Sequence, residues 1–205
     1  AGDLAAITRL LASPDPAVVM SAINACAAWK IKAAISPLAA ITHDTARPAA
    51  QRRAAINALG GLPGDEARET LVAVAGGRDA AEEDRAAAIT ALVSQWPDAA
   101  ARQAATFLTA ASDLKALDAV FRGFLATKAA ATTLATVIDA ERVALPTAAV
   151  QAGRQAISSA GRQEPELEQA LAAAGTRFGG STPLVAGRHA MRGADLDAFV
   201  ELVHT

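Results

Sequence analysis

Apolar residues recur along this chain at a regular interval of about 33 residues, a period typical of helical repeats. The stretch Ala54–Pro63, AAINALGGLP, matches SAINACAAW at Ser21–Trp29 and AAITALVSQW at Ala87–Trp96. The equally spaced isoleucines that these stretches share are Ile23, Ile56 and Ile89. A second ladder with the same two spacings comprises Ile41, Val74 and Phe107. Because two independent ladders share one period, the pattern predicts an array of helical repeats that buries both ladders.

Each period carries two helical apolar patterns, which predicts a hairpin of a first (A) helix and a second (B) helix. Asp15 is predicted to cap the first A helix and Pro16 to occupy its first position. The first B helix is expected at about 32–42, and Gly60 is expected to end the second A helix. Asp65 is predicted to cap the second B helix. The third A helix opens with acidic residues suited to a helix N-terminus, namely Glu82, Glu83 and Asp84.

The register slips after the third A helix, because the step from Leu92 to Phe124 is shorter by one position than the step from Phe124 to Ile157. Two further hairpins are expected near 112–140 and 145–175. The predicted fold class is therefore all-α, an α-solenoid of about five hairpins over residues 1–175. It begins mid-repeat, so Ala1 is expected to be a cut inside a longer protein. Residues 176–205 are expected to form a Gly-rich linker and a capping helix near 194–204, with an apolar face of Leu196, Phe199, Val200 and Val203.

Composition narrows the classes of function. The net charge is −2, and 19 basic residues are interspersed with 21 acidic ones, which argues against nucleic-acid binding. No stretch is long and apolar enough to predict a membrane span. The single cysteine, Cys26, excludes a disulfide framework but does not decide the compartment.

Two features carry candidate chemistry. Arg52 and Arg85 recur at the repeat spacing, so they form either an anion-binding ladder or braces between hairpins, and we favour the braces. His43 lies next to Asp44 in a predicted loop, where the pair resembles half of a catalytic relay or of a metal site. We favour a solvated histidine, because the other two histidines, His189 and His204, lie far along the chain.

Three further features are weaker. Cys26 lies in an apolar helical pattern, which favours a small buried hydrophobe over a nucleophile. Trp29 and Trp96 end predicted A helices, and each is a candidate partner contact or a cover for the core, two alternatives that stay open. The stretch Gly179–Thr182 resembles a phosphate-binding loop only in its glycines. We predict no catalytic residue, no metal ligand and no bound cofactor.

The pattern R-x-x-A-I in the A helix resembles the HEAT-repeat family, particularly the bacterial PBS-lyase HEAT-like type. The matching residues are Arg52–Ile56 and Arg85–Ile89, each followed one turn later by a leucine, Leu59 or Leu92. The first, fourth and fifth repeats match the pattern poorly, and in the first Val19 stands in place of the arginine. The resemblance spans roughly 14–175 and implies a curved solenoid used for binding.

Two functions follow as expectations from this resemblance. The first is a noncatalytic protein-interaction or spacer module of a larger multidomain protein, which binds a protein partner or the neighbouring domains of the same chain. The alternative is a ligand-binding or lyase-type protein that uses the concave face. The layout also resembles the HEAT segment of large secreted bacterial proteins in which a dehydrogenase-like propeller precedes the repeats and a c-type cytochrome domain follows them. That resemblance implies a periplasmic or secreted location and a C-x-x-C-H motif within about a hundred residues after Thr205.

Overall fold

The computed structural model describes residues 4–181, and every regular element in that part of the chain is a helix. In chain order the elements are α1 (Leu4–Leu10), α2 (Pro16–Ala28), the short 3₁₀ helix η1 (Lys32–Ala34), α3 (Ile35–His43), α4 (Ala49–Gly60), α5 (Asp65–Gly76), α6 (Glu82–Val93), α7 (Pro97–Ala110), α8 (Leu114–Leu125), α9 (Lys128–Ala140), α10 (Thr147–Ala160) and α11 (Pro165–Ser181). The all-α prediction is confirmed.

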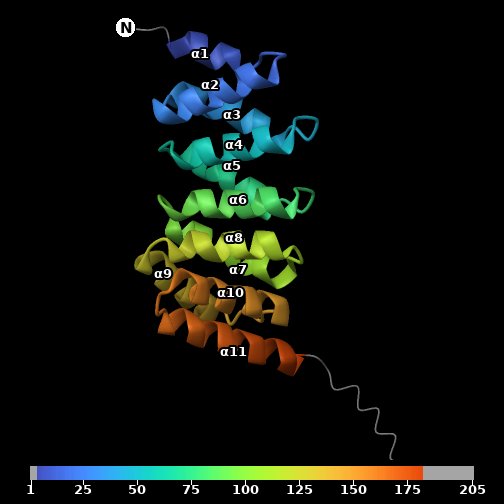
Figure 1. Cartoon of the computed structure of the whole chain (residues 1–205), viewed down its shortest axis with the longest axis vertical. Helices are drawn as coiled ribbons and strands as arrows, with labels where there is room; N and C mark the ends of the chain where they lie inside the picture. Colours follow the sequence, from blue (N-terminus) through green and yellow to red (C-terminus); the bar gives the residue numbers. More distant parts are fainter. Residues whose placement is uncertain (1–3, 182–205) are drawn as a thin grey trace, which may run out of the picture.

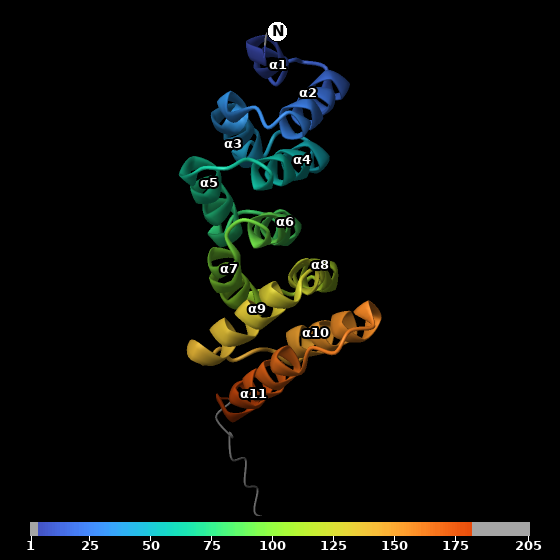
Figure 2. The ribbon, with the colours of Figure 1, turned by 90° about the vertical axis from the view of Figure 1, so that its left-hand side faces the viewer.

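The helices stack along one axis in chain order (Figure 1). The A helices α2, α4, α6, α8 and α10 form one layer, in which each helix packs on the next. The B helices α3, α5, α7, α9 and α11 form a second layer beside it, as the side view shows (Figure 2). Helix α1 precedes these five hairpins and packs on α2 and η1. Each inner hairpin therefore lies between its two neighbours, as expected for a solenoid.

The starts of the A helices reproduce the predicted register. They lie at residues 16, 49, 82, 114 and 147, so the step from α6 to α8 is shorter by one position than the other three steps, which are equal. The connection between α7 and α8 comprises only Ala111–Asp113, and the connection between α6 and α7 is one residue shorter than the one between α4 and α5; together they outweigh the two extra residues of α7 relative to α5. The connection between α5 and α6 is longer and runs from residue 77 to residue 81. Helices α7 and α8 hardly approach each other, whereas α5 and α6 pack closely.

The interior lies between the two layers and contains both predicted ladders. The exposed fractions are 1%, 0% and 0% for Ile23, Ile56 and Ile89, and 3%, 4% and 0% for Ile41, Val74 and Phe107. Full burial of one such side chain contributes roughly 1.5–3 kcal/mol to folding. The ladders are thus the apolar seam that holds consecutive hairpins together.

Helix starts follow local chemistry, with one exception to the predictions. Asp15 caps α2 by accepting a hydrogen bond from the Ala17 N–H at 2.8 Å, and Pro16 is the first helical residue, as predicted. Gly64, with φ of 130°, occupies the N-cap position of α5. The expected cap, Asp65, is instead the first residue of the helix, because the chain turns at the glycine in a conformation that other residues avoid.

The C-terminal boundary of the array lies later than predicted. Helix α11 continues through Gly175 to Ser181, whereas the sequence pattern placed a linker from residue 176 onward. Gly175 packs against Val150, since a Cβ atom at Gly175 would lie 3.2 Å from a Val150 methyl group, and it does not terminate the helix. The expected capping helix near 194–204 lies outside the described residues. None of the helices in the described range is long and apolar enough to cross a membrane.

Candidate binding surfaces

Polar side chains that follow two of the A helices hold their hairpins to the ones before them. Gln95, which follows α6, donates from Nε2 to the carbonyl oxygens of Gly60 and Leu62 at the end of α4. Arg162, which follows α10, donates in the same way to the Leu125 carbonyl at the end of α8. The last carbonyls of a helix have no partner within the helix, so these bonds satisfy them. They also fix the position of α6 on α4 and of α10 on α8.

The two repeated arginines are also engaged inside the array. Arg52 forms a salt bridge with Asp84, at 2.7 Å from Nη2 and 2.8 Å from Nε, and donates to the Arg47 carbonyl at 2.7 Å. Arg85 donates to the Ala75 carbonyl at 3.0 Å. The Arg85 guanidinium also lies 5.1 Å from the centre of the Phe107 ring, within cation–π range. Both side chains therefore brace neighbouring helices, which leaves little capacity for an external anion.

The three acidic residues at the start of α6 have individual partners that sequence reasoning missed. Glu82 accepts hydrogen bonds from the backbone N–H groups of Asp113, at 2.7 Å, and Ser112, at 2.9 Å, in the short connection before α8. The Asp113 bond, followed by those of Ser112, holds the pKa of the Glu82 carboxyl below its usual value, although desolvation opposes this. Glu83 pairs with Arg53 at 2.8 Å on the surface. The one signal in the sequence is that each acid and its partner lie slightly less than one repeat length apart.

His43 lies on a polar pocket of about 390 Å³ between the connection that follows α3 and the one that follows α5. The same pocket is lined by Arg52 and Asp84, whose Oδ1 atom is buried and has no hydrogen-bond donor in the described part of the chain. His43 is exposed, and the neighbouring Asp44 pairs with Arg47 at 3.3 Å. Within residues 4–181 no three His, Cys, Asp or Glu side chains converge closely enough to hold a metal ion.

The remaining candidate residues that the structure describes lie in the core or within a helix. Cys26 is completely buried in the core, and desolvation raises the pKa of its thiol, which disfavours the reactive thiolate. Residues 179–181 belong to the last turn of α11, and Thr182 lies outside the described residues, as do His189 and His204. Residues 179–181 are therefore helical and do not form a phosphate-binding loop.

The two tryptophans occupy different positions of the repeat. The residue two repeat lengths after Trp29 is Gln95 and not Trp96. Trp29 follows α2 and is 63% exposed, whereas Trp96 is half-buried and packs against the core before α7. Of the two open alternatives, covering the core describes Trp96, and only Trp29 is available as a partner contact.

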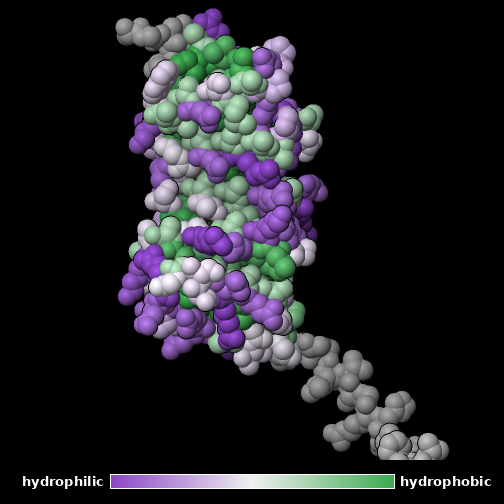
Figure 3. Space-filling view, viewed as in Figure 1, coloured by the Kyte–Doolittle hydropathy of each residue, from purple (hydrophilic) through white to green (hydrophobic). Residues whose placement is uncertain are grey.

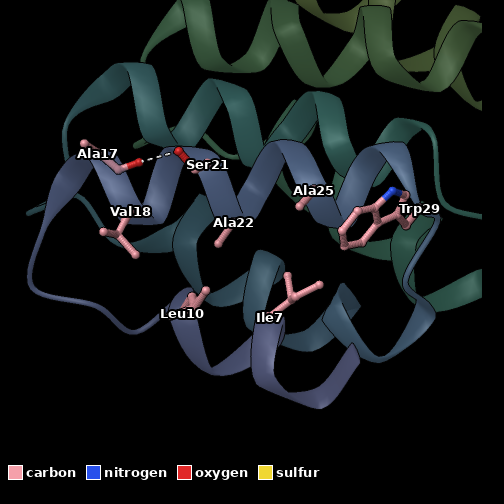
Figure 4. Close-up of a pocket in the computed structure, with 8 residues that line it drawn as sticks. All are labelled: Ile7, Leu10, Ala17, Val18, Ser21, Ala22, Ala25 and Trp29. Carbon is pink, nitrogen blue, oxygen red and sulfur yellow. Dashed lines mark hydrogen bonds between the residues drawn. The ribbon is translucent and has the colours of Figure 1, made fainter. Parts of the chain in front are cut away.

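An apolar groove of about 410 Å³ lies at the N-terminal end of the stack, between α1 and α2. Ile7 and Leu10 of α1 form one wall, and Val18 and Ala25 of α2 line the other (Figure 4). Trp29 stands at one end of the groove, opposite the end formed by Val18 and Leu10. The one hydroxyl group in the lining, that of Ser21, donates to the Ala17 carbonyl at 2.9 Å. The groove therefore suits an apolar surface and not a charged ligand.

The opposite end of the stack has a different character. Apolar side chains gather over α1 and α2, while hydrophilic side chains dominate the visible surface around α10 and α11 (Figure 3). The groove at that end is lined by Arg154, Glu168, Gln169, Pro165 and Ala172. Comparisons with protein-family models, with curated proteins and with solved structures found no match. Function is therefore inferred from the surfaces of the molecule and from the way its hairpins are joined.

Proposed function

We propose that this chain is a noncatalytic repeat module of the HEAT-like type, which spaces or binds proteins within a larger multidomain protein. The observation that carries the proposal is the set of polar braces between hairpins, together with the continuous ladders. Gln95, Arg162 and the Arg52–Asp84 pair each join one hairpin to the next. A stack joined in this way resists bending at the hairpin junctions, which is the property that a spacer needs.

A ligand-binding or lyase-type role is a weaker proposal. Its best location is the polar pocket beside His43, but the charged groups Arg52 and Asp84 in that pocket are paired with each other. A ligand that took the place of either charged group would have to break this buried pair, at a cost of several kcal/mol. The groove beside α1 is apolar and presents no titratable group for catalysis.

The spacer proposal predicts a single, narrow end-to-end distance. Ala40 of α3 and Ala172 of α11 are both exposed and lie four hairpin steps apart in the B layer. Spin labels on Ala40→Cys and Ala172→Cys should give one narrow distance distribution in the range of about 30–45 Å, from four interhelical steps of about 8–10 Å. The buried Cys26 should not react with the label in the folded chain.

A matched variant tests the braces. Gln95→Ala removes the bonds to Gly60 and Leu62, and it should broaden the distance distribution without unfolding the chain. Thr106→Ala, on the exposed surface of α7, serves as the control and should leave the distribution unchanged. A broad distribution in the unaltered chain would contradict a spacer role.

A further inference from the structure

The polar pocket beside His43 contains a buried acceptor that the Arg52–Asp84 pair leaves unused. Both bonds from Arg52, those of Nε and Nη2, go to the Oδ2 atom of Asp84. The other oxygen, Oδ1, is buried and has no donor in the described part of the chain. A buried acceptor without a donor is costly. Because Asp84 lines the pocket, a group that enters the pocket can supply that donor.

The preceding repeat contains the corresponding pocket with a donor in place. Its connection between helices, residues 44–48, is as long as the later connection, residues 77–81, and lies one repeat length earlier. Gln51 corresponds to Asp84, and its Oε1 atom accepts a hydrogen bond from Nη1 of Arg47 at 3.4 Å. The Arg47 side chain lines the earlier pocket. In that repeat, a guanidinium group therefore satisfies the acceptor from within the pocket.

The later repeat lacks this guanidinium, because Ala80 occupies the position that corresponds to Arg47. Ala80 lines the later pocket, whose volume is about 390 Å³, compared with about 290 Å³ for the earlier one. The acceptor position has also changed, from the neutral amide of Gln51 to the carboxylate of Asp84. The later repeat thus keeps the acceptor, gains a negative charge and loses the cation that would fill the space.

The charged residues that line the pocket also favour a cation. They are Arg52, Asp79 and Asp84, one positive and two negative, so the lining has a net charge of −1 (1 − 2). One bound guanidinium would neutralise this charge, whereas an anion would add to it, and like charges at an interface are costly. A metal ion is a poorer fit, because no three ligating side chains converge in the described part of the chain.

We propose that this pocket binds the guanidinium group of an arginine side chain that a partner protein presents. The guanidinium donates to Oδ1 of Asp84, as Arg47 donates to Gln51 in the repeat before. The Arg52–Asp84 pair stays intact, because the incoming group uses the oxygen that Arg52 leaves free. The exposed carboxylate of Asp79 is a second acceptor beside it. The inference rests on the proposed function, since it names the chemistry by which an interaction module holds its partner.

Titration of the whole, nitrogen-15-labelled chain with N-acetyl-arginine methylamide tests the site by nuclear magnetic resonance. Saturable chemical-shift changes are expected at the backbone amides of Gly77, Asp79 and Ala81, with a dissociation constant of about 1–10 mM, as for a single small group. N-acetyl-citrulline methylamide has the same shape but no charge. It should bind at least about tenfold more weakly, because hydrogen bonds between two charged groups are the stronger ones.

Two variants change the pocket itself. Ala80→Arg restores the residue of the earlier repeat, so it should abolish binding of the blocked arginine and raise the melting temperature by about 2–4 °C. Gln155→Arg adds the same charge at an exposed position of α10, and as the matched control it should change neither quantity. Asp79→Asn removes an exposed acceptor and should weaken binding by about threefold, as for an exposed ion pair, without affecting the fold.

Two further arms identify the source of the guanidinium. Free arginine should bind no more tightly than the blocked form, because Arg52 is engaged with Asp84 and is not available to the α-carboxylate. Tighter binding of free arginine would indicate a small-molecule ligand and overturn the partner protein. Changing Arg188 and Arg192 together to alanine should leave the affinity unchanged. A gain in affinity would mean that this chain's own arginines compete for the pocket, which would equally overturn it.

Absence of saturable shifts, or equal binding of the arginine and citrulline probes, would overturn the site itself. Water would then satisfy the buried oxygen of Asp84. Binding that persists undiminished in Ala80→Arg would place the probe elsewhere, with the same consequence. The spin-label distance across the stack is measured without any probe, so a failed pocket and a failed spacer are separate outcomes.

Discussion

Asp84 and Glu83 are neighbours in the first turn of α6, yet their carboxylates lie in opposite environments. The Asp84 side chain is 6% exposed and pairs with Arg52, whose side chain is 15% exposed, whereas Glu83 and its partner Arg53 are 52% and 39% exposed. Both acids experience the same helix N-terminus, so the favourable helix dipole is common to both. A difference between the two residues in the stability lost on substitution therefore reports the burial of the Arg52–Asp84 ion pair.

We expect Asp84→Ala to lower the free energy of unfolding by about 3 kcal/mol, because it leaves the Arg52 guanidinium buried without its counter-charge. The matched change Glu83→Ala should cost at most about 0.5 kcal/mol, as is usual for exposed pairs. Urea denaturation followed by circular dichroism measures both. Equal costs would mean that the Arg52–Asp84 pair does not brace the array.

Glu82 gives the array a defined dependence on pH. Its pKa is lower in the folded chain than in the unfolded chain, because the N–H groups of Asp113 and Ser112 donate to the carboxylate. The stabilisation is therefore fully present above the unfolded pKa and is lost as the pH falls through the folded pKa. We expect Glu82→Gln to cost about 1 kcal/mol near neutral pH.

The cost of Glu82→Gln should then shrink as the pH falls below the ordinary glutamate pKa of about 4.3 and on through the lower pKa of the folded chain, where the carboxyl of the unaltered chain also becomes protonated. Denaturation midpoints of both chains between about pH 3 and pH 7 provide the measurement, and curves that stay parallel across this range would contradict the assignment. Sequence reasoning placed Glu82 at a helix N-terminus but not in contact with the connection that precedes the next A helix. That contact depends on the short connection after α7, whose path no local pattern specifies.

Glycines mark close contacts between elements as well as helix ends. Gly60 is the last residue of α4, and it also faces Ala91 of α6, since a Cβ atom at Gly60 would lie 2.8 Å from the Ala91 Cβ and 2.9 Å from the Ala91 carbonyl oxygen. A methyl group at Gly60 would force the two helices apart. Gly179 in α11 has no atom within 4 Å of the corresponding position. Comparing alanine substitutions at these two glycines therefore separates the effect of packing on stability from the effect of intrinsic helix propensity.

Gly60→Ala should destabilise the chain by about 1–3 kcal/mol, since overpacking outweighs the gain in helix propensity. Gly179→Ala should be neutral or stabilise by up to about 1 kcal/mol. Thermal unfolding of the two variants gives the comparison. If Gly60→Ala were stabilising, α4 and α6 would not approach as closely as the structure shows.

The elements themselves follow largely from the sequence, because the apolar period marks one face of each helix and caps such as Asp15 mark the starts. The end of α11, in contrast, could not be predicted from the sequence. Gly175 carries the pattern of a helix terminator, but Arg177 beyond it donates to the Ile138 and Val143 carbonyls and pairs with Asp139. These tertiary bonds extend the helix beyond the glycine. Their partners lie a full repeat or more earlier in the chain, so no local pattern indicates them.

At the scale of the whole molecule, no sequence motif indicated a binding surface, and the one exposed candidate contact lies where a repeat helix ends. The ladder positions predicted the interior, and Trp29 was named as a contact from its place at the end of a helix. The faces by which consecutive A helices contact each other could not be derived from the sequence, because they are set by tertiary contacts such as that of Gln95 with Gly60.

Stability should be distributed along the stack, because each hairpin is held mainly by its two neighbours. Ile56 is completely buried in α4, which packs on α2 before it and on α6 after it. Ile157 is similarly buried, at 3% exposed, but lies in the last A helix, α10, of the described range. An aspartate at either site buries an unpaired carboxylate at a cost of several kcal/mol, or forces its protonation. The consequences should nevertheless differ.

Ile56→Asp should remove the support of α4 from both sides, so amide hydrogen exchange should accelerate from α1 through α5 while α8 to α11 stay protected. The helices before α4 are too few to form a stable stack alone, since repeat arrays need several coupled units. Ile157→Asp should accelerate exchange only in α10 and α11, because the remaining hairpins keep their neighbours. Exchange measured by mass spectrometry on both variants distinguishes these patterns. Uniform acceleration over the whole chain would indicate a single cooperative unit, and an unchanged melting temperature for Ile56→Asp would mean that the ladder does not hold the repeats together.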